Sequence, residues 1–98
     1  MPRTNVSLET VYALDEPKKY KVILHNDNYT SMDFVIHVLM NIFHKNALEA
    51  QEIMLQIHEK GKGICGVYTH EIAQTKVAQV SKIAKQNNFP LLATIEEE

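Results

Sequence analysis

Apolar and polar residues recur along the chain with two periods, and each period predicts one kind of element. Short runs rich in β-branched and aromatic residues predict strands, whereas apolar residues three or four positions apart predict amphipathic helices. The expected elements, in chain order, are a strand over 20–25, a helix over 31–44, a helix over 47–60, a strand over 64–68, a helix from 70 to about 87 and a strand over 91–95. This order predicts an α+β fold in which a three-stranded antiparallel sheet packs against three helices.

Two of the expected helices begin at capping signals. Thr30 followed by Asp33 matches a capping box, so we expect the Thr30 hydroxyl to accept a hydrogen bond from an unpaired N–H of the first turn. Asn46 followed by Glu49 predicts the start of the second helix, and Gly61 predicts its end. The third helix is expected to begin after a Thr69 cap.

The apolar faces of the first two helices indicate where they pack. Met32, Val35 and Ile42 belong to one stripe of the first helix, and neighbouring apolar residues widen that surface to about 240°. Such a wide apolar surface has to be covered on two sides. On the second helix His58 follows Met54 by one turn, which predicts that it lies on the shoulder of the apolar stripe and not on the solvent face.

Charge and composition narrow the class of protein. Ten basic and twelve acidic residues among 98 give a net charge of -2, without the basic excess typical of proteins that bind nucleic acid or membranes. The sequence contains neither a spanning segment nor a secretory signal, which predicts a cytoplasmic location. Residues 1–19 lack a sustained period, and Pro17 disfavours helix before it, which predicts a flexible extension followed by one domain over residues 20–98.

Candidate catalytic and metal-binding residues are few. Cys65, His58 and Asp27 are the residue types of a cysteine hydrolase, but Cys65 lies in an apolar strand-like run, where a thiol is usually buried and unreactive. His37 and His44 share one helix face, yet no carboxylate or cysteine at ligand spacing completes a metal site. We therefore expect no enzyme activity and no cofactor.

A polar cluster over residues 26–30 stands between the first strand and the first helix. Three short polar side chains, those of Asn26, Asp27 and Asn28, lie next to the wide apolar face of that helix. Such residues form turns by hydrogen bonding to their own backbone, and they also supply acceptors for a bound ligand. The residues alone leave both interpretations open.

The motifs taken together resemble those of a known family. They are YKVIL at 20–24, NDNYTSMDFV at 26–35, MLQIH at 54–58, ICGVYT at 64–69, Glu71, TKVA at 75–78 and PLL at 90–92. In this combination and order they closely resemble the ClpS family of N-degron adaptors, over roughly residues 18–96. The resemblance implies a protein that is not an enzyme. It implies binding of substrates whose first residue is Leu, Phe, Tyr or Trp, and their delivery to a ClpAP-type AAA+ unfoldase and protease.

The resemblance also implies roles for individual residues. Asn26, Asn28 and His58 match the residues that bind the substrate's α-amino group. Asn28 stands where the family usually has an aspartate, so that a neutral amide replaces a carboxylate, and Asp27 is a candidate to compensate. The wall of the pocket for the first side chain matches Thr30, Met32, Val35, Met54, Ile57 and Leu91.

The implied partner is the N-terminal domain of a ClpA-type unfoldase, bound by a monomeric adaptor. Glu71, Thr75 and Lys76 match the residues that contact it, and we expect them to be a solvated surface until that partner docks. The N-terminal extension is implied to act on the unfoldase during delivery. Two alternatives remain open. One is a general interaction domain, since the expected fold resembles the C-terminal domain of the bacterial ribosomal stalk protein, and the other is a hydrolase that uses Cys65 and His58.

Overall fold

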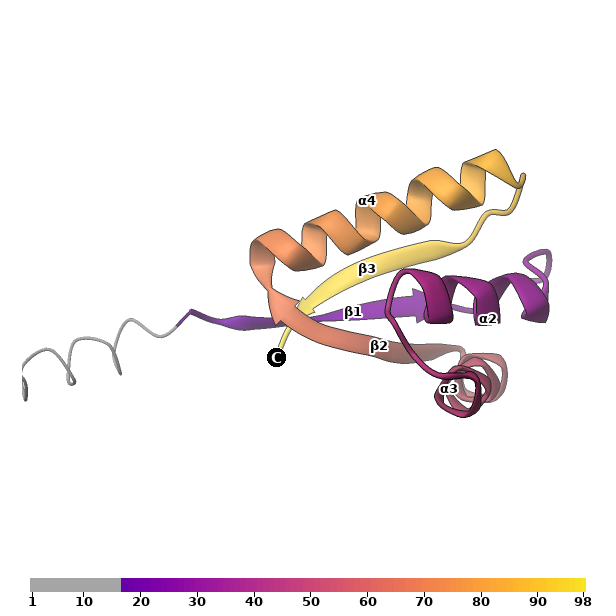
Figure 1. The fold of residues 1–98 in the computed structure, drawn as a ribbon, viewed down its shortest axis with the longest axis horizontal. Helices are drawn as coiled ribbons and strands as arrows, with labels where there is room; N and C mark the ends of the chain where they lie inside the picture. The colour runs from indigo at the N-terminus through magenta and orange to yellow at the C-terminus, as the bar shows by residue number, and fades with distance from the viewer. Residues whose placement is uncertain (1–16) are drawn as a thin grey trace, which may run out of the picture.

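The computed structural model describes residues 17–98, in which three strands and three helices form an α+β fold (Figure 1). The elements are β1 (Lys19–His25), α2 (Met32–Asn41), α3 (Ala47–Lys60), β2 (Lys62–Thr69), α4 (His70–Gln86) and β3 (Leu92–Glu97). The predicted fold class and order of elements are confirmed. The first 16 residues of the expected N-terminal extension lie outside the described residues, so the division at residue 19 stays a prediction.

The sheet has β1 at its centre, with β2 and β3 antiparallel on either side. The register with β2 shifts by one residue, because Val22 pairs with Gly66 whereas Ile23 pairs with Ile64. Cys65 is therefore the extra residue of a β-bulge, which increases the local twist of the strand.

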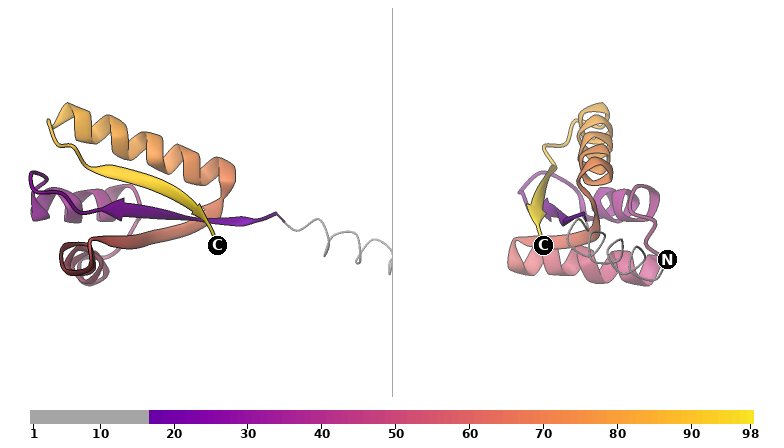
Figure 2. Two further views of the ribbon diagram at one scale, coloured as in Figure 1. Left: turned by 180° about the vertical axis from the view of Figure 1, so that it is seen from behind. Right: turned by 90° about the vertical axis from the view of Figure 1, so that its left-hand side faces the viewer.

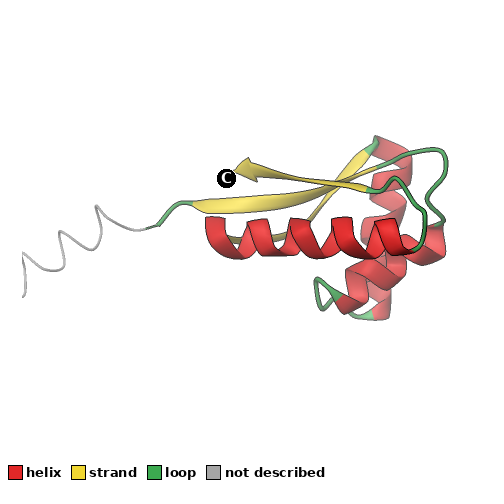
Figure 3. Cartoon of the chain, turned by 90° about the horizontal axis from the view of Figure 1, so that it is seen from above, coloured by secondary structure: helices red, strands yellow, loops and turns green. Residues whose placement is uncertain are grey.

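Alternation along β1 sends its side chains to two faces. Val22 and Leu24 are fully buried against the helices. Lys21, Ile23 and His25 point to the opposite face, where the His25 Nε2 lies 2.7 Å from the Thr94 hydroxyl. Figure 3 shows α4 along one side of the sheet, and Figure 2 shows α2 and α3 grouped at the end of the sheet where β1 ends. The core lies between these helices and the sheet.

The start of α2 differs from the expectation. Ser31, and not Thr30, is the N-cap residue, and its hydroxyl accepts a hydrogen bond from the Phe34 N–H at 3.1 Å. The Thr30 hydroxyl instead donates to the carboxylate of Asp27 at 2.7 Å. This charge-assisted hydrogen bond holds the Thr30 side chain on the Asp27 side of the loop, so Thr30 belongs to the loop before the helix.

The end of α2 also differs, because the helix stops at Asn41 and not near His44. Ile42 and Phe43 continue the apolar pattern and are buried, but they lie in the turn that follows the helix. His44 has a positive φ of 56°, a left-handed conformation that cannot continue an α-helix.

The bounds of α3 agree with the prediction at both ends. Asn46 and Glu49 form the full capping box, with side-chain to backbone hydrogen bonds of 2.8 and 3.0 Å. Gly61 ends the helix in the left-handed conformation, at φ 90°, and its N–H donates to the Ile57 carbonyl. Thr69 occupies the N-cap position of α4, but its side chain makes no capping hydrogen bond.

Candidate functional site

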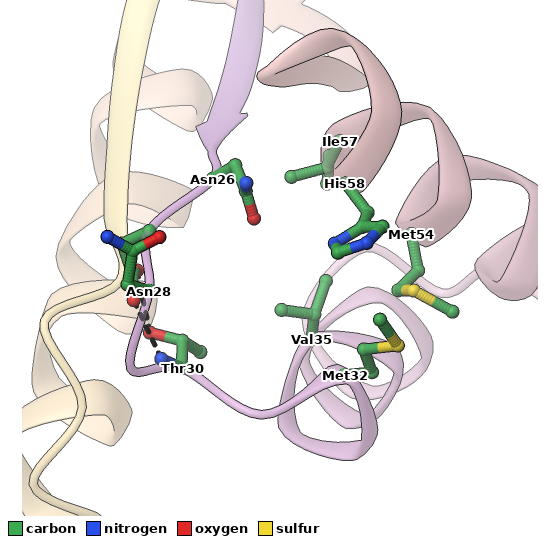
Figure 4. Close-up of a pocket in the computed structure, with 9 residues that line it drawn as sticks. Asn26, Asn28, Thr30, Met32, Val35, Met54, Ile57 and His58 are labelled. Atoms are coloured by element: carbon green, nitrogen blue, oxygen red, sulfur yellow. Dashed lines mark hydrogen bonds between the residues drawn. The ribbon is translucent and has the colours of Figure 1, made fainter.

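A hollow of about 260 Å³ opens where β1 ends, between the loop that follows β1 and the helices α2 and α3 (Figure 4). It is smaller than the about 300 to 1,000 Å³ typical of small-molecule sites. The lining residues are Asn26, Asp27, Asn28, Thr30, Met32, Val35, Met54, Ile57 and His58. Residues implied for two tasks, amine binding and side-chain binding, therefore line a single hollow.

The loop holds its shape through the carboxylate of Asp27. One oxygen accepts hydrogen bonds from the N–H groups of Tyr29 and Thr30 at 2.8 and 2.7 Å, and the other accepts the Thr30 hydroxyl. Partial burial by itself raises the pKa of Asp27, but these three hydrogen bonds outweigh it and lower the pKa below its ordinary value. Asp27 is thus ionised at neutral pH, and both of its oxygens are committed to the loop.

A backbone contact that the sequence did not reveal positions Asn26. The N–H of Asn26 donates to the carbonyl of Gly61 at 2.8 Å, which ties the end of β1 to the end of α3. The glycine was identified as a helix stop from the sequence, but nothing in the pattern indicated its partner. This bond places Asn26 and His58 on neighbouring segments of the same hollow.

Three polar side chains of the hollow have no partner within the described residues. No side-chain hydrogen bond of residues 17–98 involves Asn26, Asn28 or His58. Figure 4 shows Asn26 and His58 pointing toward one another across the hollow. His58 lies beside Met54 and Ile57 in the lining, as its place on the shoulder of the apolar stripe predicts, although its side chain is exposed. Amide oxygens and a neutral imidazole nitrogen accept hydrogen bonds, which suits a ligand rich in donors.

The apolar side of the hollow comes from both helices. Val35, Met54 and Ile57 are buried, whereas Met32 is 46% exposed. Methionine side chains adapt their shape to what they contact, so a half-exposed Met32 and a buried Met54 form an adaptable wall. Leu91 does not line the hollow. It lies in the hydrophobic core just before β3, which corrects its placement in the pocket wall.

Cys65 is unsuited to nucleophilic catalysis. Its side chain is fully buried in the core, and this burial raises the pKa of the thiol to about 12. At neutral pH almost none of it is thiolate, which is the reactive form. Within residues 17–98 no group of three or more His, Cys, Asp or Glu side chains is arranged to hold a metal ion.

The residues implied for unfoldase binding lie on the first half of α4. Glu71 and Thr75 are exposed, and the Thr75 hydroxyl donates to the Glu71 carbonyl. Lys76 is half-buried. Its ammonium donates to the Ile42 carbonyl at 2.7 Å and lies 5.8 Å from the centre of the Tyr68 ring, so it differs from the solvated side chain that was expected. The start of α4 lies at the end of the sheet away from the hollow (Figure 1).

Free acceptors beside an adaptable apolar wall define the class as a binding protein. Comparisons with known proteins specify which kind of binding protein it is. The family model described as ATP-dependent Clp protease adaptor protein ClpS matches residues 15–94. The chain belongs to the ClpS family, whose members are non-catalytic adaptors of the Clp protease. The Clp protease and its substrates are accordingly the partners of an adaptor of this family.

Individual relatives cover most or all of the chain. The ClpS adapter of Campylobacter jejuni (strain RM1221) is 56% identical over 98 residues, the full length of both chains. That of Shewanella piezotolerans is 60% identical over 84 residues, 86% of this chain and 82% of the relative. The solved structure of Agrobacterium tumefaciens ClpS2 bound to L-phenylalaninamide matches with a TM-score of 0.82 at 36% identity, over 85% of this chain and 100% of that one. In the described part of this chain, no helix has the length and apolar character needed to cross a membrane.

Proposed function

We propose that the hollow binds the first residue of a substrate protein through its free α-amino group and its large apolar side chain. The observation that carries this proposal is the convergence of three unpartnered acceptors and an adaptable apolar wall in a space of about 260 Å³. L-phenylalaninamide, bound by the Agrobacterium tumefaciens relative, has the same chemistry, because it combines a free amine, an aromatic side chain and an amide in place of a carboxylate.

The amine half of this proposal rests on charge. A free α-amino group has a reference pKa of about 7.7 to 8.0 and is largely an ammonium ion at neutral pH. Asn26, Asn28 and His58 offer one acceptor for each of its three donors. Hydrogen bonds to charged groups contribute about 1.5 to 3 kcal/mol each. N-acetylation removes the charge and two of the donors, so an acetylated end is refused.

The side-chain half rests on burial. Leu, Phe, Tyr and Trp reach the wall made by Val35, Met54 and Ile57, and burying one such side chain contributes about 1.5 to 3 kcal/mol. Met32, half-exposed beside this wall, crowds the position of the substrate Cβ and disfavours the β-branched Val and Ile. Association costs of at least about 4 kcal/mol leave a modest net affinity, which suits a carrier that has to release its cargo.

Delivery uses a different part of the molecule in this proposal. Glu71 and Thr75 form the exposed contact for the N-terminal domain of a ClpA-type unfoldase, and Lys76 joins them from its half-buried position. The adaptor acts as a monomer in the cytoplasm, and residues 1–19 act on the unfoldase during delivery. Because the contact surface and the hollow lie at opposite ends of the sheet, both partners have room to bind at once.

Fluorescence anisotropy with three labelled peptides tests the proposal. The first begins with a free Leu, the second is the same peptide N-acetylated, and the third begins with Val. We expect binding to the free Leu peptide alone, because only this peptide satisfies both halves of the hollow. Equal binding of all three would show a general interaction domain that ignores the first residue, and would overturn the proposal.

A further inference from the structure

A second hollow lies on the sheet face that points away from the core, here called the outer face. In the centre of this face Lys21 pairs with Val67 and Glu96, and Ile23 pairs with Ile64 and Thr94. Figure 3 shows α4 along the opposite side of the sheet and most of the outer face without a helix. Within residues 17–98, the carboxyl end of α3 is the helical segment that approaches it. The hollow of about 300 Å³ lies where α3 and the outer face meet, and it shares no residue with the site described above.

The lining of this hollow combines an apolar centre with positive charge. Ile64 supplies an apolar side chain that is 45% exposed and Ile23 one that is only 4% exposed, while Lys21, Lys60 and Lys62 supply three ammonium groups. The one acidic side chain among the lining residues is Glu96. The surroundings are therefore positive, although the whole chain carries a net charge of -2.

These lysines are not neutralised within the described part of the chain. The salt bridge found in residues 17–98 joins Lys18 to Glu97 at 3.3 Å, and none of the three lysines of the hollow takes part in one. The three ammonium groups line one hollow and repel one another. An anionic occupant would relieve that repulsion while it gains attraction from all three lysines.

The apolar surface continues beyond the hollow along the sheet. Ile64, Val67 and Leu92 are 45%, 42% and 55% exposed, and all three lie on the outer face. Val67 lies beside Lys21 and Leu92 beside His25, so these apolar side chains are spread between polar ones across the face, and exposed apolar surface bordered by polar residues is typical of protein interaction sites. A single small anion would fill only the hollow, whereas an extended segment would cover its apolar continuation as well.

We propose that the outer face binds an extended acidic peptide segment of another protein, with one aliphatic or aromatic side chain of that segment in the hollow. Carboxylates on either side of this side chain pair with Lys60 and Lys62 at one edge and with Lys21 in the sheet. Exposed aromatic side chains on which bases stack are typical of single-stranded nucleic-acid sites, and the lining of this hollow contains none. Acidic peptide therefore fits this surface better than nucleic acid.

An NMR titration of the full-length, ¹⁵N-labelled protein with the peptide Ac-Glu-Asp-Leu-Glu-Asp-NH₂ tests the proposal. The acetyl group removes the α-ammonium, so the result is independent of the amine site and of the function proposed for it. We expect shifts of the amide signals of Ile23 and Ile64, and binding that weakens as salt is added. The Lys62→Glu variant should bind the peptide at least about fivefold more weakly, because an attractive charge becomes a repulsive one.

Controls separate this surface from a general charge effect. Lys85→Glu makes the same charge change at an exposed position of α4 and should leave the peptide affinity unchanged. Equal binding of the neutral peptide Ac-Gln-Asn-Leu-Gln-Asn-NH₂, or equal losses in the two variants, would overturn the proposal. Two other occupants of the outer face would also overturn the proposal. If a second copy of the chain binds there, the amide signals of Ile23 and Ile64 should shift when the free protein is concentrated. If the chain's own acidic residues bind there, the same signals should shift in the variant that carries Glu9→Gln, Asp15→Gln and Glu16→Gln.

Discussion

Replacing Asn28 by aspartate should tighten the binding of a peptide with a free N-terminus. Asn28 lines the hollow, is exposed and has no hydrogen-bond partner within the described residues, so a carboxylate at this position is free to face the ammonium of the ligand. Asp27 cannot take this part, because three hydrogen bonds hold both of its oxygens in the loop. The substitution adds an attractive charge without removing a contact.

The size of the effect follows from the exposure of the site. Two unit charges 4 Å apart attract by about 1 kcal/mol in water and by about 4 kcal/mol near a protein surface. Because Asn28 is exposed, we take the lower value, which corresponds to an about fivefold lower dissociation constant. Repulsion between neighbouring carboxylates in the free protein acts in the same direction, because the ammonium relieves it on binding.

Fluorescence anisotropy at low and high salt measures this gain. Asn28→Asp should bind the free Leu peptide about fivefold more tightly at low salt, lose most of the gain at about 1 M salt, and still refuse the acetylated peptide. The matched control is Gln79→Glu, which makes the same change from amide to carboxylate on the exposed face of α4. Unchanged or weaker affinity of Asn28→Asp, or an equal gain in the control, would refute the reasoning.

The remaining predictions address other parts of the site and the core. His58→Phe should weaken binding of the Leu peptide about tenfold, because the acceptor nitrogen of the ring is lost, and an unchanged affinity would contradict the acceptor role. Asp27→Asn should lower the free energy of unfolding by about 1 to 2 kcal/mol at pH 7. The pKa of Asp27 is lowered in the folded state, so its contribution to the free energy of unfolding is present above the ordinary carboxyl pKa of about 3.9 and is lost as the pH falls through the lowered value. Urea denaturation should therefore show that the free energies of unfolding of the variant and the parent become equal in acid. Cys65, with its pKa raised to about 12, should resist iodoacetamide at pH 8 until urea unfolds the protein, as followed by mass spectrometry, and rapid labelling of the native protein would contradict its burial. Glu71→Ala should weaken unfoldase binding while leaving the peptide affinity unchanged, and a parallel loss of both would argue against separate surfaces.

Local signals in the sequence predicted some elements well and others poorly. The bounds of α3 were correct because an unambiguous capping box and a glycine stop enclose it. The end of α2 was wrong because Ile42 and Phe43 continue the apolar pattern while belonging to a turn. Periodicity reports which residues are buried and not which backbone conformation buries them.

For the site as well, the sequence predicted the residues that local motifs contain and missed the contacts between segments far apart in the chain. The sequence predicted Thr30 as the cap of α2, and this was wrong because the Thr30 hydroxyl donates to Asp27 while the neighbouring Ser31 caps the helix. All the residues that line the hollow were named from motifs, but the bond between Asn26 and Gly61 joins segments far apart in sequence and has no signature there. The positive hollow of the outer face likewise depends on strand pairing, which brings Lys21 and Lys62 onto the same face of the sheet.

The central claim is that one hollow recognises both the free α-amino group and the side chain of the first residue. A crystal structure of the protein with a peptide that begins with Leu tests it most directly. We expect the ammonium nitrogen within about 3 Å of acceptor atoms of Asn26, Asn28 and His58, and the Leu side chain against Val35 and Met54. A peptide bound elsewhere, or bound in the hollow with its amino group directed into solvent, would contradict the account.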